Sequence, residues 1–290
     1  MPELPEVETI KLVLQRKIVG LTIKNIEILS TKSFIGKPQQ IISKQVVKVW
    51  RRAKMLGIEL SGKMTLLFHL KMTGQVIYQK SNIKNQNGRF VGGHPTEDMV
   101  GPMPNSHTRV IFTFNDESKL YFNDQRKFGW VKIIKGIENG VQGIVFEKLG
   151  PEPLEKDFTW QILKNNLLKH KSQPVKVALM DQSVVSGVGN IYSNEACFNA
   201  GIDPRTKVGN LTDNQFKSLH QGAQKALRDG ISHGGSTRAH FRDPEGHKGY
   251  FLDYAYVYGL DKHPCKVCKT IIKKISLGGR GTYYCEKCQK

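Results

Sequence analysis

The first residues of the chain that could do chemistry are Pro2 and Glu3. If Met1 is removed, Pro2 presents a secondary amine, and an amine that attacks a carbonyl or a sugar C1′ forms an iminium ion, which is an electron sink. Glu3 adds a carboxyl group beside that amine, where it suits proton transfer. The alternative is that Pro2 only leads into a helix and that the following acids complement the helix dipole. This segment by itself favours the second interpretation.

The C-terminal cysteines form the most specific pattern in the chain. Cys265-x-x-Cys268 and Cys285-x-x-Cys288 are separated by 16 residues. Two such pairs are typical of tetrahedral zinc ligation, with iron–sulfur ligation as a minor alternative because its cysteine runs are spaced differently. Since all four positions are Cys, we predict one structural Zn²⁺ ion that holds a β-hairpin with Arg280 at its turn.

Composition indicates the kind of partner. Lys and Arg number 44 against 25 Asp and Glu, which gives a formal charge of +19 and a pI of about 9.7. Such an excess favours a polyanion, and nucleic acid is the commonest one. The sequence has neither an apolar run long enough for a bilayer nor the pattern of a signal peptide, so we expect a cytoplasmic chain with no membrane contact. Cys197, outside the two pairs, is interpreted as a small buried side chain.

The elements that must position these residues differ between the two halves. In the first half, Val7, Ile10 and Leu14 follow at helical spacing, and Gly20 ends the helix. Residues 21–80 and 109–134 then read as short strands with turns between them, which predicts an antiparallel β-sandwich. Residues 81–107 are polar and rich in Gly and Pro, and we interpret them as one long loop or insertion.

The second half is predicted to be helical. Helices are expected over 157–170, 175–181, 190–199 and 212–229, with a capping box from Thr212 to Gln215. Residues 233–250 are Gly-rich and basic, and we interpret them as a mobile loop near the substrate. The fold class is therefore α+β multidomain. The predicted division is 1–135 for a helix and β-sandwich catalytic domain, 136–152 for a linker, 153–259 for a helical DNA-binding domain and 260–290 for a zinc finger.

Three segments have the residue types that bind nucleic acid. Arg51-Arg52-Ala53-Lys54 lies between strands and suits phosphate contacts. Arg126 and Phe128 share a loop, a pair that suits base stacking or filling a gap in a duplex; the alternative is a hairpin with Phe128 in the core. Asn190 follows a Gly-rich turn into a helix, where backbone N–H groups can bind phosphate, although a generic tight turn explains this segment as well.

Taken together, these motifs resemble the formamidopyrimidine-DNA glycosylase family. The motifs appear in the family's order and span nearly the whole chain. They are Met1-Pro2-Glu3-Leu4-Pro5-Glu6-Val7-Glu8-Thr9, Arg51-Arg52-Ala53-Lys54, Asp124-x-Arg126-Lys127-Phe128-Gly129, Leu149-Gly150-Pro151-Glu152-Pro153, Gly187-Val188-Gly189-Asn190-Ile191-Tyr192 and the four cysteines.

The resemblance implies an N-terminal helix with a β-sandwich, then a helix–two-turns–helix domain, then a zinc-ribbon hairpin. It implies a monomer that excises oxidised purines such as 8-oxoguanine and formamidopyrimidines from double-stranded DNA, and then cuts the strand by β- and δ-elimination. Such an enzyme would be nucleoid-associated while it acts. The chain departs from the family's common pattern over 81–107 and 242–250. In the family, the second of these loops covers the extruded base.

Residue roles follow from the same resemblance. Pro2 would form the Schiff base, Glu3 would handle protons at the sugar, and Lys54 and Arg280 would be the proton donors for β- and δ-elimination. Residues at DNA-contacting positions of the family are His107, Arg126, Lys171, Asn190 and Lys176. Met72, Arg126 and Phe128 would fill the space left by the flipped nucleotide, whose unstacking costs a few kcal/mol.

Two other hypotheses compete with this one. An endonuclease VIII-like enzyme for oxidised pyrimidines would resemble Pro-Glu-Gly-Pro-Glu at the start, whereas this chain has Leu4 and Val7-Glu8. A non-catalytic DNA-binding protein on the same scaffold would have no reason to retain both Pro2 and Glu3. The glycosylase is therefore the hypothesis that the sequence favours.

Overall fold

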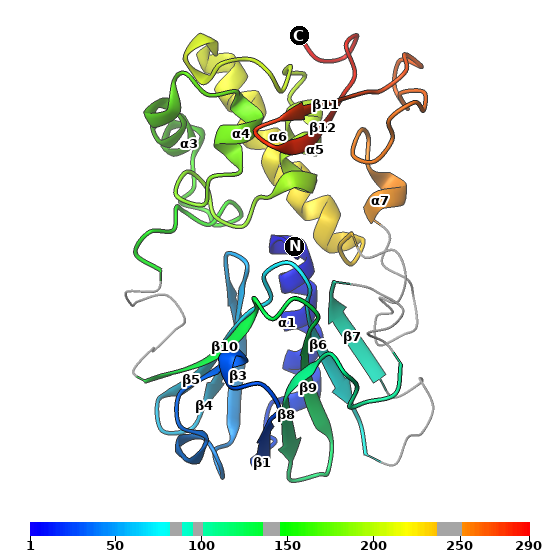
Figure 1. Cartoon of the computed structure of the whole chain (residues 1–290). Helices are drawn as coiled ribbons and strands as arrows, with labels where there is room; N and C mark the ends of the chain where they lie inside the picture. Colours follow the sequence, from blue (N-terminus) through cyan, green and yellow to red (C-terminus); the bar gives the residue numbers. More distant parts are fainter. Residues whose placement is uncertain (82–88, 95–100, 136–145, 237–250) are drawn as a thin grey trace. The chain divides into compact units, whose positions relative to one another are not determined.

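The computed structural model describes residues 1–81, 89–94, 101–135, 146–236 and 251–290 (Figure 1). The chain forms two compact units. The first comprises the described residues of 1–146 and 233–250, and the second those of 147–232 and 251–290. The four-part division made from the sequence stays a prediction.

The first unit contains two five-stranded sheets. Their strand orders are β1-β8-β9-β6-β7 and β2-β10-β5-β4-β3, and every pairing is antiparallel except the short one between β10 and β2. The predicted β-sandwich is confirmed. The strands are β1 (Ile23–Ile28), β2 (Phe34–Ile35), β3 (Val46–Arg52), β4 (Met55–Leu60), β5 (Met64–His69), β6 (Gly74–Gln79), β7 (Arg89–Gly93), β8 (Thr108–Phe114), β9 (Lys119–Asp124) and β10 (Trp130–Lys135).

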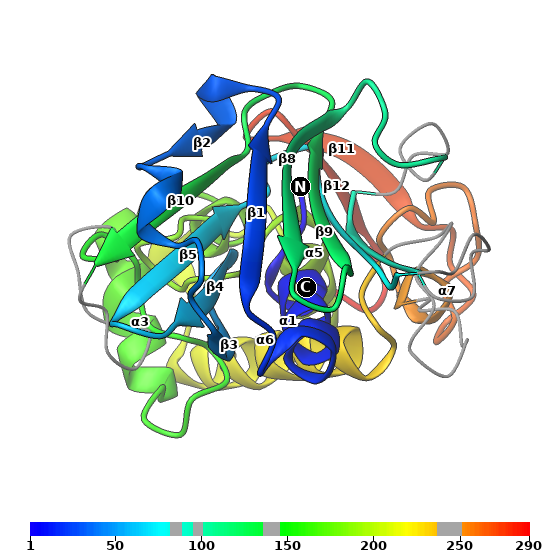
Figure 2. The same cartoon turned by 90° about the horizontal axis from the view of Figure 1, so that it is seen from below.

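Helix α1 (Leu4–Ile18) joins the two sheets (Figure 2). It packs on β3, an edge strand of one sheet, and on β7, an edge strand of the other. Its apolar face, which includes Val7, Ile10 and Leu14, lies in the same buried cluster as side chains from both sheets. Because this face is buried at helical spacing, the start of the chain is fixed to the body of the unit.

Strand β7 corrects the interpretation of 81–107 as one long loop. It pairs with β6 through the register Gln75↔Gly93 to Gln79↔Arg89. The strand was not predicted because it contains Gly92 and Gly93, and Gly usually indicates a loop. Here Gly92 is needed for packing, since a Cβ at this position would lie 2.3 Å from Cγ1 of Ile10 on α1. Residues 82–88 and 95–100 lie outside the described part of the chain.

The second unit is mainly helical, as predicted. The capping box at the start of α6 is confirmed, because the Thr212 N–H donates to Gln215 Oε1 at 2.9 Å and the Gln215 N–H donates to Thr212 Oγ1 at 3.3 Å. No helix of the described residues is long and apolar enough to cross a bilayer. The helices are α3 (Trp160–Leu167), α4 (Val175–Leu179), α5 (Asn190–Asn199), α6 (Asp213–Ser232) and α7 (Phe251–Tyr254), with short 3-10 turns at Thr31–Ser33, Pro38–Gln40, Leu168–His170 and Val208–Asn210.

The chain ends in the hairpin β11 (Lys273–Leu277) and β12 (Arg280–Tyr284). A two-stranded hairpin is marginal by itself and needs packing or a metal to be stable. Strand β12 packs on α5, and Asn194 of α5 accepts the Tyr283 N–H at 2.7 Å. The last residues are also fixed, since Gln289 donates to the Ile202 carbonyl at 2.9 Å. The hairpin is therefore built onto the helices of its own unit.

Candidate functional site

Pro2 and Glu3 are held at the start of α1. Pro2 is buried, and only 3% of Glu3 is exposed. Glu3 is the N-cap residue of the helix, and its N–H donates to Glu6 Oε2 at 2.8 Å in a capping box. Pro5 lies in the first turn, where a missing N–H costs nothing. Both interpretations of this segment are thus compatible, because the cap that starts the helix also fixes the carboxyl group next to Pro2.

Lys54 lies close to these acids. It follows Ala53 in the tight turn between β3 and β4, and Ala53 takes a φ of 54°, a left-handed conformation that costs a non-glycine residue about 1 kcal/mol. Burial lowers the pKa of the Lys54 ammonium below its usual range, while the charges of Glu3 and Glu6 oppose that shift. The structure therefore brings Lys54 together with the start of α1, and the lowered pKa makes its proton easier to donate.

An ion pair fastens the Lys54 turn to α1. The Arg51 Nε donates to Glu8 Oε2 at 2.8 Å, and Arg51 Nη1 donates to the Ala53 carbonyl at 3.0 Å. Burial raises the pKa of Glu8, but the hydrogen bonds from Lys11 and Arg51 outweigh it and leave that pKa lowered. Arg51 therefore helps to position Lys54, and its contact with phosphate stays a prediction.

His69 belongs to the same site, although the sequence did not single it out. It is the last residue of β5, and its ring lies 5.7 Å from that of Trp130 between centroids. The Lys71 N–H donates to His69 Nδ1 at 3.1 Å, which assigns the ring proton to Nε2. Burial, helped by the charges of Lys71 and Lys54, lowers the pKa of His69 to about 3. A lone His at a strand end gives no spacing signal, so only the fold identifies it.

We expect His69 to make stability depend on pH. The unfolded chain protonates this side chain below about pH 6.5, and the folded chain does so only near pH 3, so the stabilisation is complete above pH 6.5 and is lost as pH falls. Between pH 7 and pH 5 the free energy of unfolding should fall by about 2 kcal/mol on this account. His69→Asn, whose amide oxygen can still accept the Lys71 N–H, should remove that part of the decrease. Urea unfolding of both proteins at the two pH values checks this prediction. An equal decrease in the free energy of unfolding for the parent protein and His69→Asn would contradict it.

Glu6 links α1 to a distant segment. Its Oε1 accepts the Ser236 N–H at 2.8 Å, while its Oε2 accepts the Glu3 N–H. The chain therefore returns to the first unit at 233–236, directly before residues 237–250. The predicted mobile loop at 233–250 lies mostly outside the described residues, as do its basic side chains Arg238, His240, Arg242, His247 and Lys248.

The loop between β9 and β10 presents four exposed side chains in succession, Gln125 to Phe128. Phe128 is 56% exposed, so the alternative that placed it in the core is wrong. The Arg126 guanidinium lies 4.9 Å from the centre of the Phe128 ring. Exposing a large aromatic ring is costly in water, and a ring held beside a cation is suited to a partner with flat apolar surfaces, such as stacked bases.

His107 and Met72 lie near this loop in the first unit. The His107 carbonyl accepts the Asp124 N–H at 2.9 Å, and the His107 N–H donates to Asn105 Oδ1 at 2.9 Å. Met72 is half-buried in the turn between β5 and β6. Of the sequence-predicted residues, the first unit thus holds Pro2, Glu3, Lys54, Met72, His107, Arg126 and Phe128.

The second unit holds the remaining ones. Lys171 is exposed at the end of a 3-10 turn, and its carbonyl accepts the Gly209 N–H at 2.9 Å. Asn190 is the first residue of α5; its Oδ1 accepts from Lys176 Nζ at 2.5 Å and its Nδ2 donates to the Gly281 carbonyl at 3.1 Å. Lys176 is fully buried. In this geometry it would act on DNA through Asn190, whose amide has a second N–H donor.

Arg280 is exposed at the start of β12, directly after a tight turn. Gly278 and Gly279 form that turn with φ values of 58° and 69°, which Gly adopts without strain. The position of Arg280 depends on the base of the hairpin, where the cysteines lie, and on the hydrogen bond between Asn190 and Gly281. A side chain of this reach and charge suits a phosphate group.

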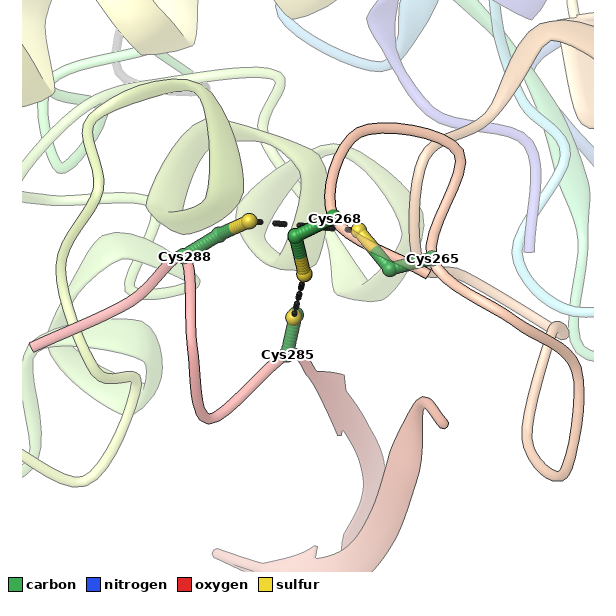
Figure 3. A group of neighbouring side chains, drawn as sticks. All are labelled: Cys265, Cys268, Cys285 and Cys288. Carbon is green, nitrogen blue, oxygen red and sulfur yellow. Dashed lines mark hydrogen bonds between the residues drawn. The ribbon is translucent and has the colours of Figure 1, made fainter. Parts of the chain in front are cut away.

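The four cysteines form a metal site. Their sulfur atoms all lie within 4.8 Å of one another and turn toward a common centre (Figure 3). The Cys265–Cys288 sulfurs are 3.9 Å apart and the Cys268–Cys285 sulfurs 3.3 Å apart, against about 3.8 Å for a tetrahedron with Zn–S bonds of about 2.3 Å. The residues therefore fit the predicted zinc ion, which would be structural because no position is left for substrate.

Removing one ligand should release the metal and loosen the hairpin. We expect Cys268→Ala to lose the single equivalent of zinc and most of its DNA affinity, since Arg280 then loses its support. Cys197→Ala is the matched control, because Cys197 is fully buried, lies outside the cluster and has a pKa raised by burial to about 12. Elemental analysis measures the zinc content of the two variants, and duplex titration measures their DNA affinity. Full zinc content in Cys268→Ala would contradict the assignment.

Comparison with known proteins agrees with this geometry. Three family models match in sequence order: formamidopyrimidine-DNA glycosylase N-terminal domain at 1–131, formamidopyrimidine-DNA glycosylase H2TH domain at 149–242, and zinc finger found in FPG and IleRS at 262–290. Formamidopyrimidine-DNA glycosylase of Bacillus subtilis is 37% identical over 296 residues, covering 100% of this chain and 99% of the relative. The Wolbachia enzyme of the same name is 36% identical over 294 residues, covering 100% of both.

Solved structures are similar over the same length. The MutM (Fpg) protein of Thermus thermophilus is 30% identical, with a TM-score of 0.81 over 99% of this chain and 98% of that one. Lactococcus lactis Fpg, solved with DNA containing N7-benzyl-Fapy-dG, is 28% identical, with a TM-score of 0.84 over 100% of both chains.

The helix and β-sandwich, the helical unit and the four-cysteine hairpin define a helix–two-turns–helix protein with a C-terminal zinc finger. Within that class, the chain belongs to the formamidopyrimidine-DNA glycosylase family. The resemblance seen in the sequence is therefore confirmed, and so are the α+β fold class and the four-cysteine zinc site.

Proposed function

We propose that the protein is a DNA glycosylase and abasic-site lyase that removes oxidised purines, such as 8-oxoguanine and formamidopyrimidines, from duplex DNA. Its relatives have this name over their full length, and the neighbouring Lactococcus lactis structures include complexes with Fapy-dG and abasic-site DNA. The enzyme would act in the cytoplasm, at the nucleoid. The net charge of +19 supports a polyanionic substrate.

The first step is an attack by the Pro2 nitrogen on C1′ of the damaged nucleotide. The N–C1′ bond forms, and the glycosidic bond breaks with its electron pair leaving on the base, which takes up a proton. Glu3 would give a proton to the sugar ring oxygen as the base leaves and the ring opens, which yields the iminium ion. Met1 precedes Pro2 in the structure, so this role requires the mature chain in which Met1 has been removed.

The later steps are eliminations from the iminium ion. Loss of a proton from C2′ expels the 3′ phosphate, and loss of a proton from C4′ then expels the 5′ phosphate. Lys54, whose pKa is lowered by burial, would supply the proton for the first, and Arg280 would stabilise the phosphate expelled in the second. The zinc ion would take no part in these steps, since it would hold the hairpin that presents Arg280.

One observation supports the proposal more than any other. Pro2 and Glu3 are buried at a capped helix start, and the buried ammonium of Lys54 lies close enough for its charge to interact with that of Glu3. A protein that only bound DNA would gain nothing from burying an acid and a base in this place, because burying charges is costly.

Borohydride trapping tests the proposal. The mature protein, incubated with a duplex that has 8-oxoguanine opposite cytosine, should give a covalent protein–DNA adduct on reduction. A duplex with an oxidised pyrimidine serves as the comparison. Trapping on the pyrimidine duplex alone would favour an endonuclease VIII-like enzyme. The lack of an adduct with either duplex would contradict the proposed lyase activity.

A further inference from the structure

The carboxylate of Asp124 connects the two loops of the first unit that carry Met72, Arg126 and Phe128. It is fully buried at the end of β9, and each of its oxygens accepts hydrogen bonds. Asp124 Oδ2 accepts the Gly129 N–H at 2.6 Å, and Oδ1 accepts the Arg126 N–H at 3.2 Å. One carboxylate thereby holds both ends of the exposed loop that carries Arg126 and Phe128.

Thr73 joins a second loop to the same carboxylate. Its hydroxyl donates to Asp124 Oδ1, and it also accepts the Arg126 N–H at 3.1 Å. Thr73 is 8% exposed and follows Met72 directly in the turn between β5 and β6. The Arg126 N–H is therefore shared between Thr73 and Asp124, so the position of Met72 is tied to that of Arg126.

The backbone of Asp124 extends the connection to His107. The Asp124 N–H donates to the His107 carbonyl at 2.9 Å, and its carbonyl accepts from Arg109 Nε at 2.8 Å. Arg109 Nη1 also donates to the Ser106 carbonyl at 2.9 Å. The buried Arg109 guanidinium interacts electrostatically with Asp124, which offsets the cost of burying the carboxylate.

The loop geometry depends on this arrangement. Lys127 takes a φ of 58°, a left-handed conformation that a non-glycine residue adopts only when its surroundings hold it there. Gly129 must be small, since a Cβ there would lie 2.9 Å from Phe122 Cζ and 3.1 Å from Asp124 Oδ2. The close approach of the loop to the carboxylate is therefore built into the sequence.

We propose that Thr73 and Asp124 are positioning residues that hold Met72, Arg126 and Phe128 as one preorganised wedge for insertion into the duplex. The inference rests on the proposed function, because it assumes that these three side chains fill the space of the extruded nucleotide. Preorganisation matters here, because three side chains on two loops must enter the gap together, and ordering them at that moment would cost entropy. Neither Thr73 nor Asp124 needs to touch DNA.

The test compares three proteins that differ at Thr73. Thr73→Val keeps the shape and removes the hydroxyl, whereas Thr73→Ser keeps the hydroxyl and removes a methyl group. Each is assayed in single turnover for release of 8-oxoguanine and for cleavage of a pre-formed abasic site. Fluorescence of 2-aminopurine placed beside the lesion reports unstacking by the wedge, and thermal unfolding reports the fold.

We expect Thr73→Val to release 8-oxoguanine about tenfold more slowly, which corresponds to about 1.4 kcal/mol, with a reduced 2-aminopurine signal. Cleavage of the abasic site should change less than about twofold, because no base has to be extruded. Thr73→Ser should behave like the parent protein. Asp124→Asn should show the same selective loss, because its NH₂ group would face a backbone N–H, and it serves as the second variant if Thr73→Val does not fold.

Two results would overturn the inference. In the first, Thr73→Val keeps both the parent rate of base release and the full fluorescence change. In the second, both reactions fall equally together with the unfolding temperature, which would make Thr73 a residue of general stability. Failure of the parent protein itself to release 8-oxoguanine would instead refute the proposed function, so the two failures are distinguishable.

Discussion

A protein in which any residue still precedes Pro2 will give no borohydride-trapped adduct, and its strand cleavage will be slower by at least about a thousandfold. In such a chain the Pro2 nitrogen belongs to an amide, whose lone pair is delocalised into the carbonyl group and cannot attack C1′. Gel analysis of reduced reactions with an 8-oxoguanine duplex measures the adduct.

The control is the same extended protein after a protease has removed every residue before Pro2, so that Pro2 is the N-terminal residue. It should recover both adduct and cleavage, which shows that the loss comes from the blocked nitrogen. Duplex affinity should change little between the two forms, because the other proposed DNA contacts are unaltered. Full trapping by the blocked form would mean that another amine, such as Lys54, is the nucleophile.

Glu3→Gln should slow release of 8-oxoguanine by about 10² to 10⁴ fold while a pre-formed abasic site is cut at close to the parent rate. Gln preserves the size of the side chain but cannot transfer a proton. The substitution leaves intact the hydrogen bond from the Glu3 N–H to Glu6, so the start of α1 should remain folded. Single-turnover rates on the two substrates check the prediction.

Glu27→Gln is the matched control, since Glu27 is an exposed carboxylate on β1 of the same unit. It should leave both rates unchanged. Equal losses on the two substrates for Glu3→Gln would show that Glu3 acts in elimination as well, and its assigned role at base release would then be wrong.

The sequence predicted the elements whose patterns are local. Val7, Ile10 and Leu14 gave α1, Thr212 and Gln215 gave the start of α6, and the two Cys pairs gave the metal site. Each of these signals depends on residues a few positions apart, where geometry follows directly from spacing.

The sequence could not predict features that depend on contacts between distant residues. Strand β7 was missed because Gly usually indicates a loop, whereas Gly92 is required here by the close packing of α1 on the strand. The partners of Arg51 and Lys176 could not be predicted for the same reason: Arg51 bonds to Glu8 and Lys176 bonds to Asn190, each within its own unit. His69 could be assigned to the site only from the structure, which places it close enough to Lys54 for their charges to interact.

The most direct measurement is peptide mapping by mass spectrometry of the reduced conjugate between the mature wild-type enzyme and an 8-oxoguanine duplex. If the account is correct, the sugar remnant is attached to the nitrogen of the N-terminal peptide that begins with Pro2. A remnant attached to a lysine side chain, in protein shown to lack Met1, would contradict it.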